Sequence, residues 1–497
     1  MKPLGSFMPF LRVFPILGAI VMVFALTMLV PLGVSLWTQD GASSAFPVAM
    51  ALTFVCGALM RSAVWRVGHK LELQKRDGIL LVGLAWTLLP LFACVPLLLY
   101  FGPTSTPLSF TDAYFEAMSG LTTTGATVLV GLDRLPGSIN LWRCFLQWLG
   151  GMGILVLAVA ILPMLGVGGS QLFRAEATGP MKDAKLTPRI TETAKGLWTV
   201  YCLLSLACVL GYWLAGMSAL DAWIHMFATL SLGGLSSHDS SFGYFQLPAA
   251  EWVAIVFMLL ASCNFALYFV ALVKRQPARI WRDAEWRGSM LLLVGSGLFI
   301  AGLLLVKGSL SDPVVAVRTA LFNVVSIAST TGFSTVDYTT WPVFAPLFML
   351  MLSGVATSAG STGAGIKMAR IVILVKQARR EMARIVHPRA VNPVTMGGNV
   401  VDSSTIFSVL GFMLVYGGTI IGLTMVLLLT DMPFDTAFSA VVASVNNMGP
   451  GLNEVGPAGN FAGLSDFQTW VCALAMLLGR LEMLSFLVLF TPGFWRK

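Results

Sequence analysis

The stretch FTDAYFEAMSGLTTTGAT (110–127) decides the fold of this chain. A short amphipathic run leads there into a cluster of threonines and glycines. The run is too short to cross a bilayer, which takes about 20 apolar residues. Non-helical backbone at membrane depth is tolerated only where it is buried in protein or lines a water-filled cavity. If this chain lies in a membrane, the stretch predicts a half-helix that enters the bilayer and turns back.

Composition places the chain in the membrane. Of its 497 residues, 57% are hydrophobic and 11% are charged, whereas soluble domains have about 25% charged residues. Ten apolar segments predict spans, and the first is longer than the apolar core of a signal peptide, about 7–15 residues. The segments are 10–36, 46–62, 78–101, 139–165, 197–217, 251–273, 288–306, 342–376, 404–430 and 467–490.

The opening stretch has three counterparts, ALDAWIHMFATLSLGGLSS (219–237), VVAVRTALFNVVSIASTTGFST (314–335) and FDTAFSAVVASVNNMGPGL (434–452). Their last cluster glycines, Gly125, Gly234, Gly332 and Gly449, are 109, 98 and 117 residues apart. One such cluster could be an ordinary extracellular turn, but four at a regular interval indicate one structural unit used four times. Four re-entrant turns on one axis predict a pore, because a ring of backbone carbonyls can replace the hydration shell of a cation.

Basic residues predict the orientation, because cytoplasmic loops collect Lys and Arg. Most of the 31 lie in segments 2–12, 62–76, 174–195, 274–287, 376–389 and 496–497, all on one side of a ten-span topology. Both termini are therefore expected in the cytoplasm. The opposite face has Arg134, Arg143, Lys307 and Arg318 against thirteen acids, including Asp112 and Glu116. That face should attract cations. The basic charge lies in short loops beside spans, which argues against nucleic-acid binding.

Enzyme classes find little support. The histidines at 69, 225, 238 and 387 lack metal-ligand spacing. The seven cysteines fall in apolar stretches and are expected to be inert packing residues. GSTGAGIK (360–367) is not a phosphate-binding loop, because that motif needs its lysine directly after the second glycine.

Two features inside the predicted spans leave alternatives open. Small and polar residues in SGVATSAGSTGAGIK (353–367) interrupt the eighth span, and they could serve tight helix packing or a movable gate. Arg480 lies in the middle of the tenth span. An intramembrane charge usually faces the interior and marks an ion path, although Arg480 could also be a packing partner of Glu482.

Longer motifs carry a family resemblance. The chain resembles the Trk/Ktr/HKT superfamily of potassium transporters, and closely its bacterial Trk-type, TrkH-like membrane subunit. The resemblance covers nearly the whole chain and rests on SGLTTTGATVLVGLD (119–133), QWLGGMGILVLAVAILPMLGVGG (147–169), GSTGAGIKMAR (360–370), RIVHPRAV (384–391), NNMGPGL (446–452) and GRLEMLSFLVLFTPGFWR (479–496).

The resemblance implies an all-α polytopic membrane protein for potassium uptake. Four M1–pore-loop–M2 pseudo-repeats, 77–194, 195–287, 288–402 and 403–497, would surround a pore, after two extra N-terminal helices in 1–76. Gly125, Gly234, Gly332 and Gly449 would line the filter. Carbonyls of Thr123, Thr124, Leu232, Gly233, Thr330, Thr331, Asn447 and Met448 would complete the potassium sites. Sodium-preferring relatives have serine at the first glycine, so Gly125 favours potassium.

The resemblance also implies a gate and partners. The 353–367 stretch would be an intramembrane loop under the filter, with gate residues Gly360, Ser361, Thr362, Gly363, Gly365, Lys367 and Arg480. The family forms homodimers in the bacterial cytoplasmic (inner) membrane, on a cytosolic ring of nucleotide-binding, TrkA-like subunits. No cofactor is expected. Two alternatives stay open, namely a carrier coupled to sodium or protons and a less selective channel for monovalent cations.

Overall fold

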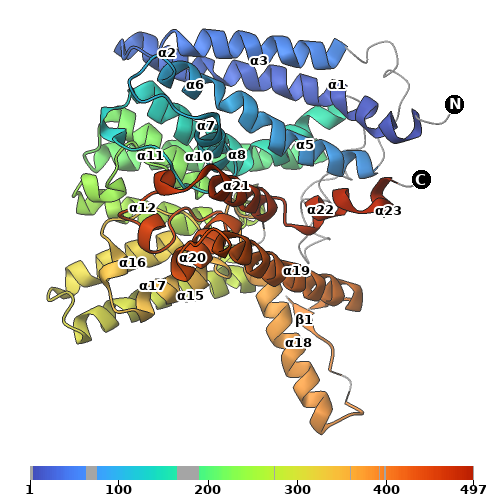
Figure 1. Cartoon of the computed structure of the whole chain (residues 1–497). Coiled ribbons are helices and arrows are strands. Elements are labelled where there is room, and N and C mark those ends of the chain that lie inside the picture. Colours follow the sequence, from blue (N-terminus) through green and yellow to red (C-terminus); the bar gives the residue numbers. More distant parts are fainter. Residues whose placement is uncertain are drawn as a thin grey trace.

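The computed structural model describes residues 4–62, 75–164, 190–273, 275–358, 360–390, 392–396 and 399–495. The described chain is α-helical except for the hairpin of β1 (Thr395–Met396) and β2 (Asn399–Val400). This confirms the predicted all-α fold class. The long helices run roughly parallel or antiparallel to one another, and α1 begins at the same end of the molecule at which α23 lies (Figure 1).

Two N-terminal helices form a packed pair. α1 (Leu4–Thr27) continues as α2 (Leu29–Thr38), and α1 packs along α3 (Ala45–Ser62). A Cβ on Gly18 would lie 2.6 Å from the carbonyl oxygen of Gly57, so the two backbones touch where both residues lack a side chain. Arg12 joins this pair to the next helix through an ion pair with the buried Asp77.

Four segments then share one order of elements, namely a long helix, a short helix, a non-helical turn and a second helix. The first has α5 (Lys75–Ala93), α6 (Val95–Phe101), α7 (Phe110–Leu121) and α8 (Gly137–Met164); the second has α10 (Ile190–Leu214), α11 (Ala219–Ser231), α12 (Pro248–Ala261) and α13 (Phe265–Val273). The third has α15 (Ala284–Val306), α16 (Pro313–Ala328), α17 (Phe344–Ser353) and α18 (Met368–Val386); the fourth has α19 (Ser403–Leu428), α20 (Phe434–Val445), α21 (Asp466–Arg480), α22 (Leu484–Leu487) and α23 (Pro492–Trp495).

Short elements connect these helices. They are α14 (Ala278–Arg282) and the 3-10 turns η1 (Leu132–Arg134), η2 (Ser241–Tyr244), η3 (Tyr338–Thr340), η4 (Asn453–Val455), η5 (Phe461–Gly463) and η6 (Val488–Phe490). The order of elements follows the predicted plan, while the repeat boundaries themselves stay a prediction.

Six of the described helical stretches are long and apolar enough to cross a membrane: Arg12–Thr38, Ala45–Ser62, Arg76–Phe101, Lys195–Leu214, Ala284–Val306 and Ser403–Leu428. The predicted span over 251–273 is bent, because α12 and α13, which together are long and apolar enough to cross a membrane, meet at an angle of 87°. The eighth predicted span has no helix between Ser353 and Met368, and α21 ends at Arg480 inside the tenth. The second helices of three segments are therefore broken.

Three of the four short helices, α7, α11 and α16, are capped by a side chain at the N-terminus, and all four are buried at the C-terminus. Ser109, Ser218 and Asp312 are N-caps whose side chains accept backbone N–H bonds from the first turns of α7, α11 and α16. Their last turns are buried, as is that of α20. Each helix thus ends inside the protein, with the negative end of its dipole toward the following turn.

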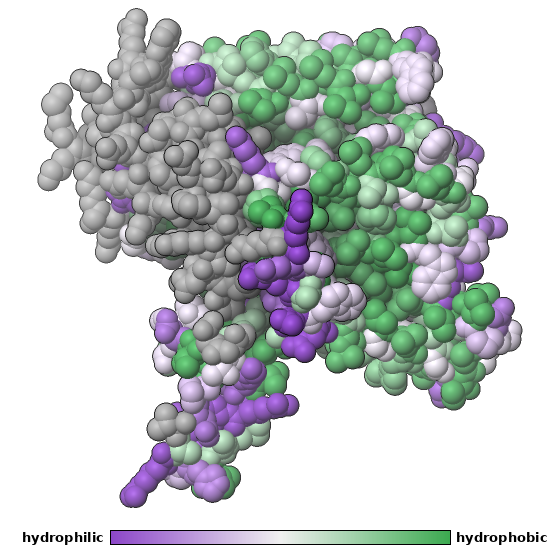
Figure 2. Space-filling view, turned by 180° about the vertical axis from the view of Figure 1, so that it is seen from behind, coloured by the Kyte–Doolittle hydropathy of each residue, from purple (hydrophilic) through white to green (hydrophobic). Residues whose placement is uncertain are grey.

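The outer surface suits lipid contact. Figure 2 shows a broad hydrophobic area, a hydrophilic rim along one side and a hydrophilic arm at the bottom. Exposed apolar side chains include Leu210, Leu291, Phe407 and Leu414, and so large an apolar surface is typical of membrane proteins. The arm is α18, which projects from the body in Figure 1.

Candidate functional site

Four non-helical turns follow the four short helices, and each turn has the same backbone conformation. We number them turn 1 (Thr123, Thr124, Gly125), turn 2 (Leu232, Gly233, Gly234), turn 3 (Thr330, Thr331, Gly332) and turn 4 (Asn447, Met448, Gly449). In every turn the first residue is left-handed, with φ between 48° and 65°, and the third is a left-handed glycine, with φ between 74° and 95°. The middle residue's N–H donates to the carbonyl five residues back, at 2.8 Å in all four turns.

The four turns close into a ring. A Cβ on Gly125 would lie 2.1 Å from the carbonyl oxygen of Gly233 in the next turn. The same contact recurs at 2.0 Å, 2.2 Å and 2.8 Å for the pairs Gly234 with Thr331, Gly332 with Met448, and Gly449 with Thr124. Each glycine therefore faces the carbonyl of the following turn, and the fourth turn returns to the first. We call these twelve residues the filter ring.

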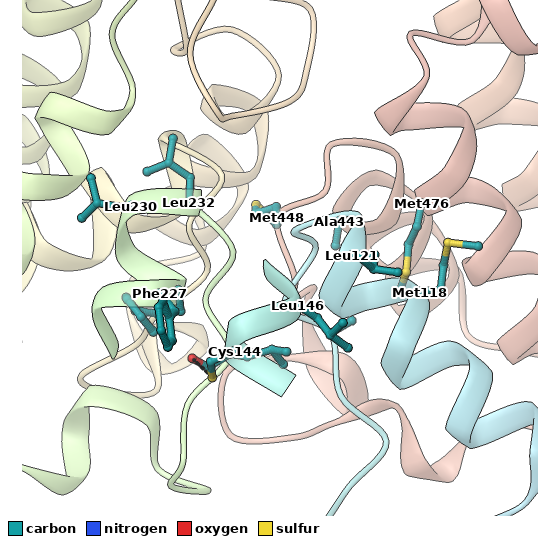
Figure 3. Packing of buried hydrophobic residues seen from close by; sticks show 14 of the residues in the cluster. Met118, Leu121, Cys144, Leu146, Phe227, Leu230, Leu232, Ala443, Met448 and Met476 are labelled. Atoms are coloured by element: carbon teal, nitrogen blue, oxygen red, sulfur yellow. Dashed lines mark hydrogen bonds between the residues drawn. The ribbon is translucent and has the colours of Figure 1, made fainter. Parts of the chain in front are cut away.

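Hydrogen bonds between buried polar side chains stabilise the filter ring. The hydroxyls of Thr122 and Thr124 bond at 2.7 Å, and those of Ser329 and Thr331 do the same at 2.7 Å. Asn447 donates from turn 4 to the hydroxyl of Thr124 in turn 1 at 2.9 Å. Figure 3 shows Leu232 and Met448, from turns 2 and 4, among buried side chains of α7, α8, α11, α20 and α21.

Glu116 is not part of the outer surface, which corrects the expectation that it attracts cations there. It is 1% exposed and pairs with the equally buried Arg143 at 2.7 Å. It also accepts bonds from the hydroxyl of Thr127 and the N–H of Val128, just after turn 1. Arg143 in turn donates to the carbonyl of Ser236, beyond turn 2. The Glu116–Arg143 pair therefore stabilises the segments that follow turns 1 and 2 and is not in contact with water.

The broken stretch 354–367 lies against turns 2 and 3 of the filter ring and the ends of the helices that precede them. Thr362 donates to the carbonyl of Leu230 at 3.0 Å, and the N–H of Ala364 reaches the hydroxyl of Thr330 at 3.4 Å. A Cβ on Gly363 would be 3.2 Å from both Leu232 and the carbonyl of Ser329. Of this stretch, Ala359 lies outside the described residues.

The same stretch is folded on itself by the other predicted gate residues. Gly360 and Gly365 have φ of +79° and +84°, and Lys367, with φ of +71°, donates from Nζ to the carbonyl of Gly363 at 2.6 Å. Ser361 bonds to the carbonyl of Ser358 at 2.7 Å. These contacts describe a compact loop, which does not continue either flanking helix.

The loop is hydrogen-bonded to the bend between α12 and α13. The sequence analysis did not predict this bend. The N–H of Ser358 donates to the carbonyl of Ser262 at 2.9 Å, and the N–H of Phe265 donates to the carbonyl of Gly360 at 3.2 Å. A Cβ on Gly360 would lie 2.8 Å from Oδ1 of Asn264. The polar triplet around Cys263 within an apolar run was the only signal in the sequence.

Arg480 connects the loop to the filter ring. Its Nη1 donates to the hydroxyl of Thr123 and to the carbonyl of Thr362, both at 3.0 Å, and its Nη2 donates to the carbonyl of Gly150 at 2.6 Å. Glu482, the alternative partner considered for Arg480, pairs with Arg370 at 2.5 Å. The arginine thus touches turn 1, the loop and α8 at once.

A titratable cluster joins the outer connections of turns 1 and 2. His238 contacts Asp133 at 2.5 Å and Asp221 at 3.4 Å, and it stacks on Tyr244 with ring centres 3.5 Å apart. Burial works to lower the pKa of His238, but the bonds to Asp221 and Asp133 outweigh it and raise that pKa. Burial works to raise the pKa values of Asp133 and Asp221, but the hydrogen bonds with His238 outweigh burial, so both pKa values are lowered.

Known proteins match the chain over nearly its whole length. The family described as TrkH, cation transport protein, matches residues 45–497. The Trk system potassium uptake protein TrkH of Vibrio parahaemolyticus is 45% identical, over 99% of this chain and 100% of that protein. The protein of the same name in Escherichia coli K12 is 44% identical, over 99% and 100%. The crystal structure of the potassium transporter TrkH from Vibrio parahaemolyticus matches with a TM-score of 0.88 at 43% identity, over 98% of this chain and 100% of that one.

Proposed function

Because this chain belongs to the TrkH family of cation transport proteins, we propose that it takes up potassium ions through a pore lined by the filter ring. The observation that carries the proposal is the closure of four turns with one backbone conformation, each glycine against the next turn's carbonyl. The chain is a multi-pass membrane protein. Potassium is its transported ion, and we propose neither a cofactor nor a catalysed reaction.

Backbone geometry and charge both favour a cation at the filter ring. Carbonyl oxygens gathered around an axis replace the water that an ion loses on entry. The four short helices point the negative ends of their dipoles at the turns, about half an elementary charge each. A bare glycine at each third position keeps side chains out of the ring. The site therefore suits a monovalent cation held by backbone oxygens.

The loop at 354–367 is the proposed gate. It lies against turns 2 and 3, and Arg480 bonds it to turn 1. The guanidinium also places a fixed positive charge beside the ion path, which shortens the residence of a cation there. Opening would require the loop to leave its seat at Ser262 and Asn264, which costs only a few hydrogen bonds because no regular helix has to unfold.

Partners and orientation belong to the same proposal. The chain would lie in a bacterial cytoplasmic membrane with both termini in the cytoplasm, as the distribution of its basic residues indicates. Two copies of the chain would form a homodimer, and a cytosolic ring of nucleotide-binding, TrkA-like subunits beneath it would regulate transport. The arm α18 carries Lys376, Arg379, Arg380 and Arg384, and its basic charge favours a place on the cytoplasmic side.

Rubidium uptake into vesicles that contain the purified chain tests the proposal. At a fixed voltage, uptake should be competed by potassium far better than by sodium, and Gly125→Ser should weaken this discrimination. Gly131→Ser is the matched control, because Gly131 is also left-handed at +76° but has no atom within 4 Å of an added Cβ. Equal potassium-over-sodium discrimination in the two variants would show that turn 1 does not line the pore. Uptake that needs a sodium or proton gradient would indicate a coupled carrier instead.

A further inference from the structure

We infer that Gln147 of α8 is a positioning residue of the filter, whose carboxamide replaces the side chain that turn 2 lacks. The inference rests on the proposed function, since it assigns a role within the same filter ring. It concerns one of the four turns and makes that turn different from its equivalents in a way that selectivity can report.

Gln147 holds turn 2 from two sides. Its Nε2 donates to the carbonyl oxygen of Gly233 at 2.5 Å, and its Oε1 accepts the N–H of Leu235 at 3.1 Å. The side chain is fully buried, with 0% exposure. Gln147 belongs to the first segment and Gly233 to the second, so these bonds join neighbouring quarters of the ring.

The middle position of turn 2 is unlike the other three. Turns 1, 3 and 4 have Thr124, Thr331 and Met448 there, and turn 2 has Gly233. The backbone does not demand this glycine, because Gly233 is not among the left-handed residues of the described chain. Space does demand it, because a Cβ on Gly233 would lie 2.5 Å from Cδ and 2.7 Å from Nε2 of Gln147.

Hydrogen bonding shows the same exchange. In turns 1 and 3 the middle threonine bonds to the hydroxyl two residues earlier, at Thr122 and Ser329. The corresponding residue before turn 2 is Ser231, whose hydroxyl bonds back to the carbonyl of Phe227. The carboxamide of Gln147 therefore supplies a polar contact at the middle of turn 2, where turns 1 and 3 have the hydroxyl of a threonine.

An equivalent position on α21 shows that glutamine is not required by the helix packing. Gly150 and Gly479 each approach the last carbonyl of a short helix, with an added Cβ 1.9 Å from Leu121 O and from Val445 O respectively. Three residues before each lie Gln147 and Met476. Met476 lies on α21, which packs against α7, and the turn after α7 has Thr124 in its middle, so a methionine occurs where the turn has its own polar side chain.

Selectivity is the property this support should control. The carbonyl of Gly233 lies against Gly125 of the neighbouring turn, and a carbonyl that loses its donor can tilt or shift toward a smaller ion. Leaving the Gly233 carbonyl and the Leu235 N–H unpaired in a buried site destabilises the native geometry of turn 2. A preference for potassium would fall by about tenfold if about 1.4 kcal/mol of it were lost.

A swap experiment tests the inference. Four variants of the full chain are needed: Gln147→Met, Gln147→Ala, Gly233→Thr, and Gln147→Ala combined with Gly233→Thr. Competition of rubidium uptake by sodium is measured in vesicles at fixed voltage, per folded transporter. Each single variant should lose about tenfold in potassium-over-sodium preference. The double variant, which gives turn 2 the middle residue of turns 1 and 3, should recover most of it.

Two results would overturn the inference. One is an unchanged preference in a folded Gln147→Met, since methionine preserves volume but removes both hydrogen bonds. The other is a double variant no better than the worse single one. Should a single variant fail to fold, the double variant decides alone by retaining or losing the preference. Gly125→Ser is measured alongside: if it too leaves selectivity intact, the proposed filter fails, whereas loss in Gly125→Ser alone rejects only the role of Gln147.

Discussion

Residue by residue, the filter ring is built from conformations that most side chains avoid. Thr123 and Thr330 are β-branched, yet their φ values are 55° and 65°, a region that costs roughly 1–2 kcal/mol outside glycine. Such strain persists only where surrounding bonds determine the backbone. The N–H of each following residue is fixed at 2.8 Å to the short helix before it. Strain at equivalent places in all four turns supports the proposal that the ring is the functional site.

The buried pair of Glu116 and Arg143 should support this ring. Changing Glu116→Gln leaves the Arg143 charge buried without its carboxylate, and we expect the free energy of unfolding to fall by about 3–5 kcal/mol. Denaturant unfolding of the purified chain in detergent measures the change. Glu381→Gln is the control, because Glu381 pairs with Arg384 on the exposed arm. Equal stability of the two variants would contradict the bracing role.

His238 should make stability depend on pH. Its pKa is raised above the ordinary value of 6.5, so its contribution is complete below that value and is lost as pH rises through the folded-state pKa. Asp133 has a lowered pKa, so its contribution is lost only as pH falls well into the acid range. The unfolding temperature should therefore fall above neutral pH, and this fall should be smaller in His238→Gln. Parallel curves for the two proteins between pH 6 and 9 would rule the cluster out as the cause.

At the scale of elements, the broken second helices position the loop at 354–367, which is the proposed gate. The bend between α12 and α13 exposes backbone groups at Ser262 and Phe265, and the loop at 354–367 satisfies them. α21 ends where Arg480 reaches the loop, and Glu482 and Met483 follow with left-handed φ of 53° and 50°. Breaks in neighbouring helices thus meet at one level beneath the filter ring. A loop held by hydrogen bonds, without helical continuity, can move while the surrounding spans stay fixed.

Removing the arginine should open a leak. Arg480→Ala deletes the bonds to Thr123, Thr362 and Gly150, and a shift of about 1.4 kcal/mol toward the open state would raise flux about tenfold. Tracer flux per folded transporter, in vesicles without any cytosolic partner, is the measurement. Deletion of 358–363 should have the same direction of effect.

Arg318→Ala serves as the matched control for this leak. Arg318 is also paired across two helices, with Glu251 at 2.9 Å, but within the described part of the chain it makes no hydrogen bond to the filter ring or the loop. Its loss should lower stability without raising flux. If stable Arg480 and deletion variants leak no more than the unmutated chain, the stretch at 354–367 is a packing break.

For the whole molecule, local composition predicts the four turns, whereas features that depend on contacts between residues far apart in the sequence could not be predicted. Polar clusters in an apolar chain indicated the four turns, because only buried or cavity-lining backbone can leave the helix in a bilayer. The 87° bend at 262–264 was missed because Ser, Cys and Asn within a long apolar run do not by themselves end a span. Glu116 was assigned to the surface because its partner Arg143 lies 27 residues away. Gln147 was missed for the same reason, since it meets Gly233 across 86 residues.

The most direct test of the whole account is the position of a bound ion. The purified chain would be crystallised or imaged with rubidium, and the ion located by anomalous scattering or by difference density against a sodium sample. The account predicts rubidium on the axis of the filter ring, coordinated by the carbonyls of Thr124, Gly233, Thr331 and Met448. A rubidium ion bound elsewhere, with that axis unoccupied under conditions in which the chain transports rubidium, would contradict it.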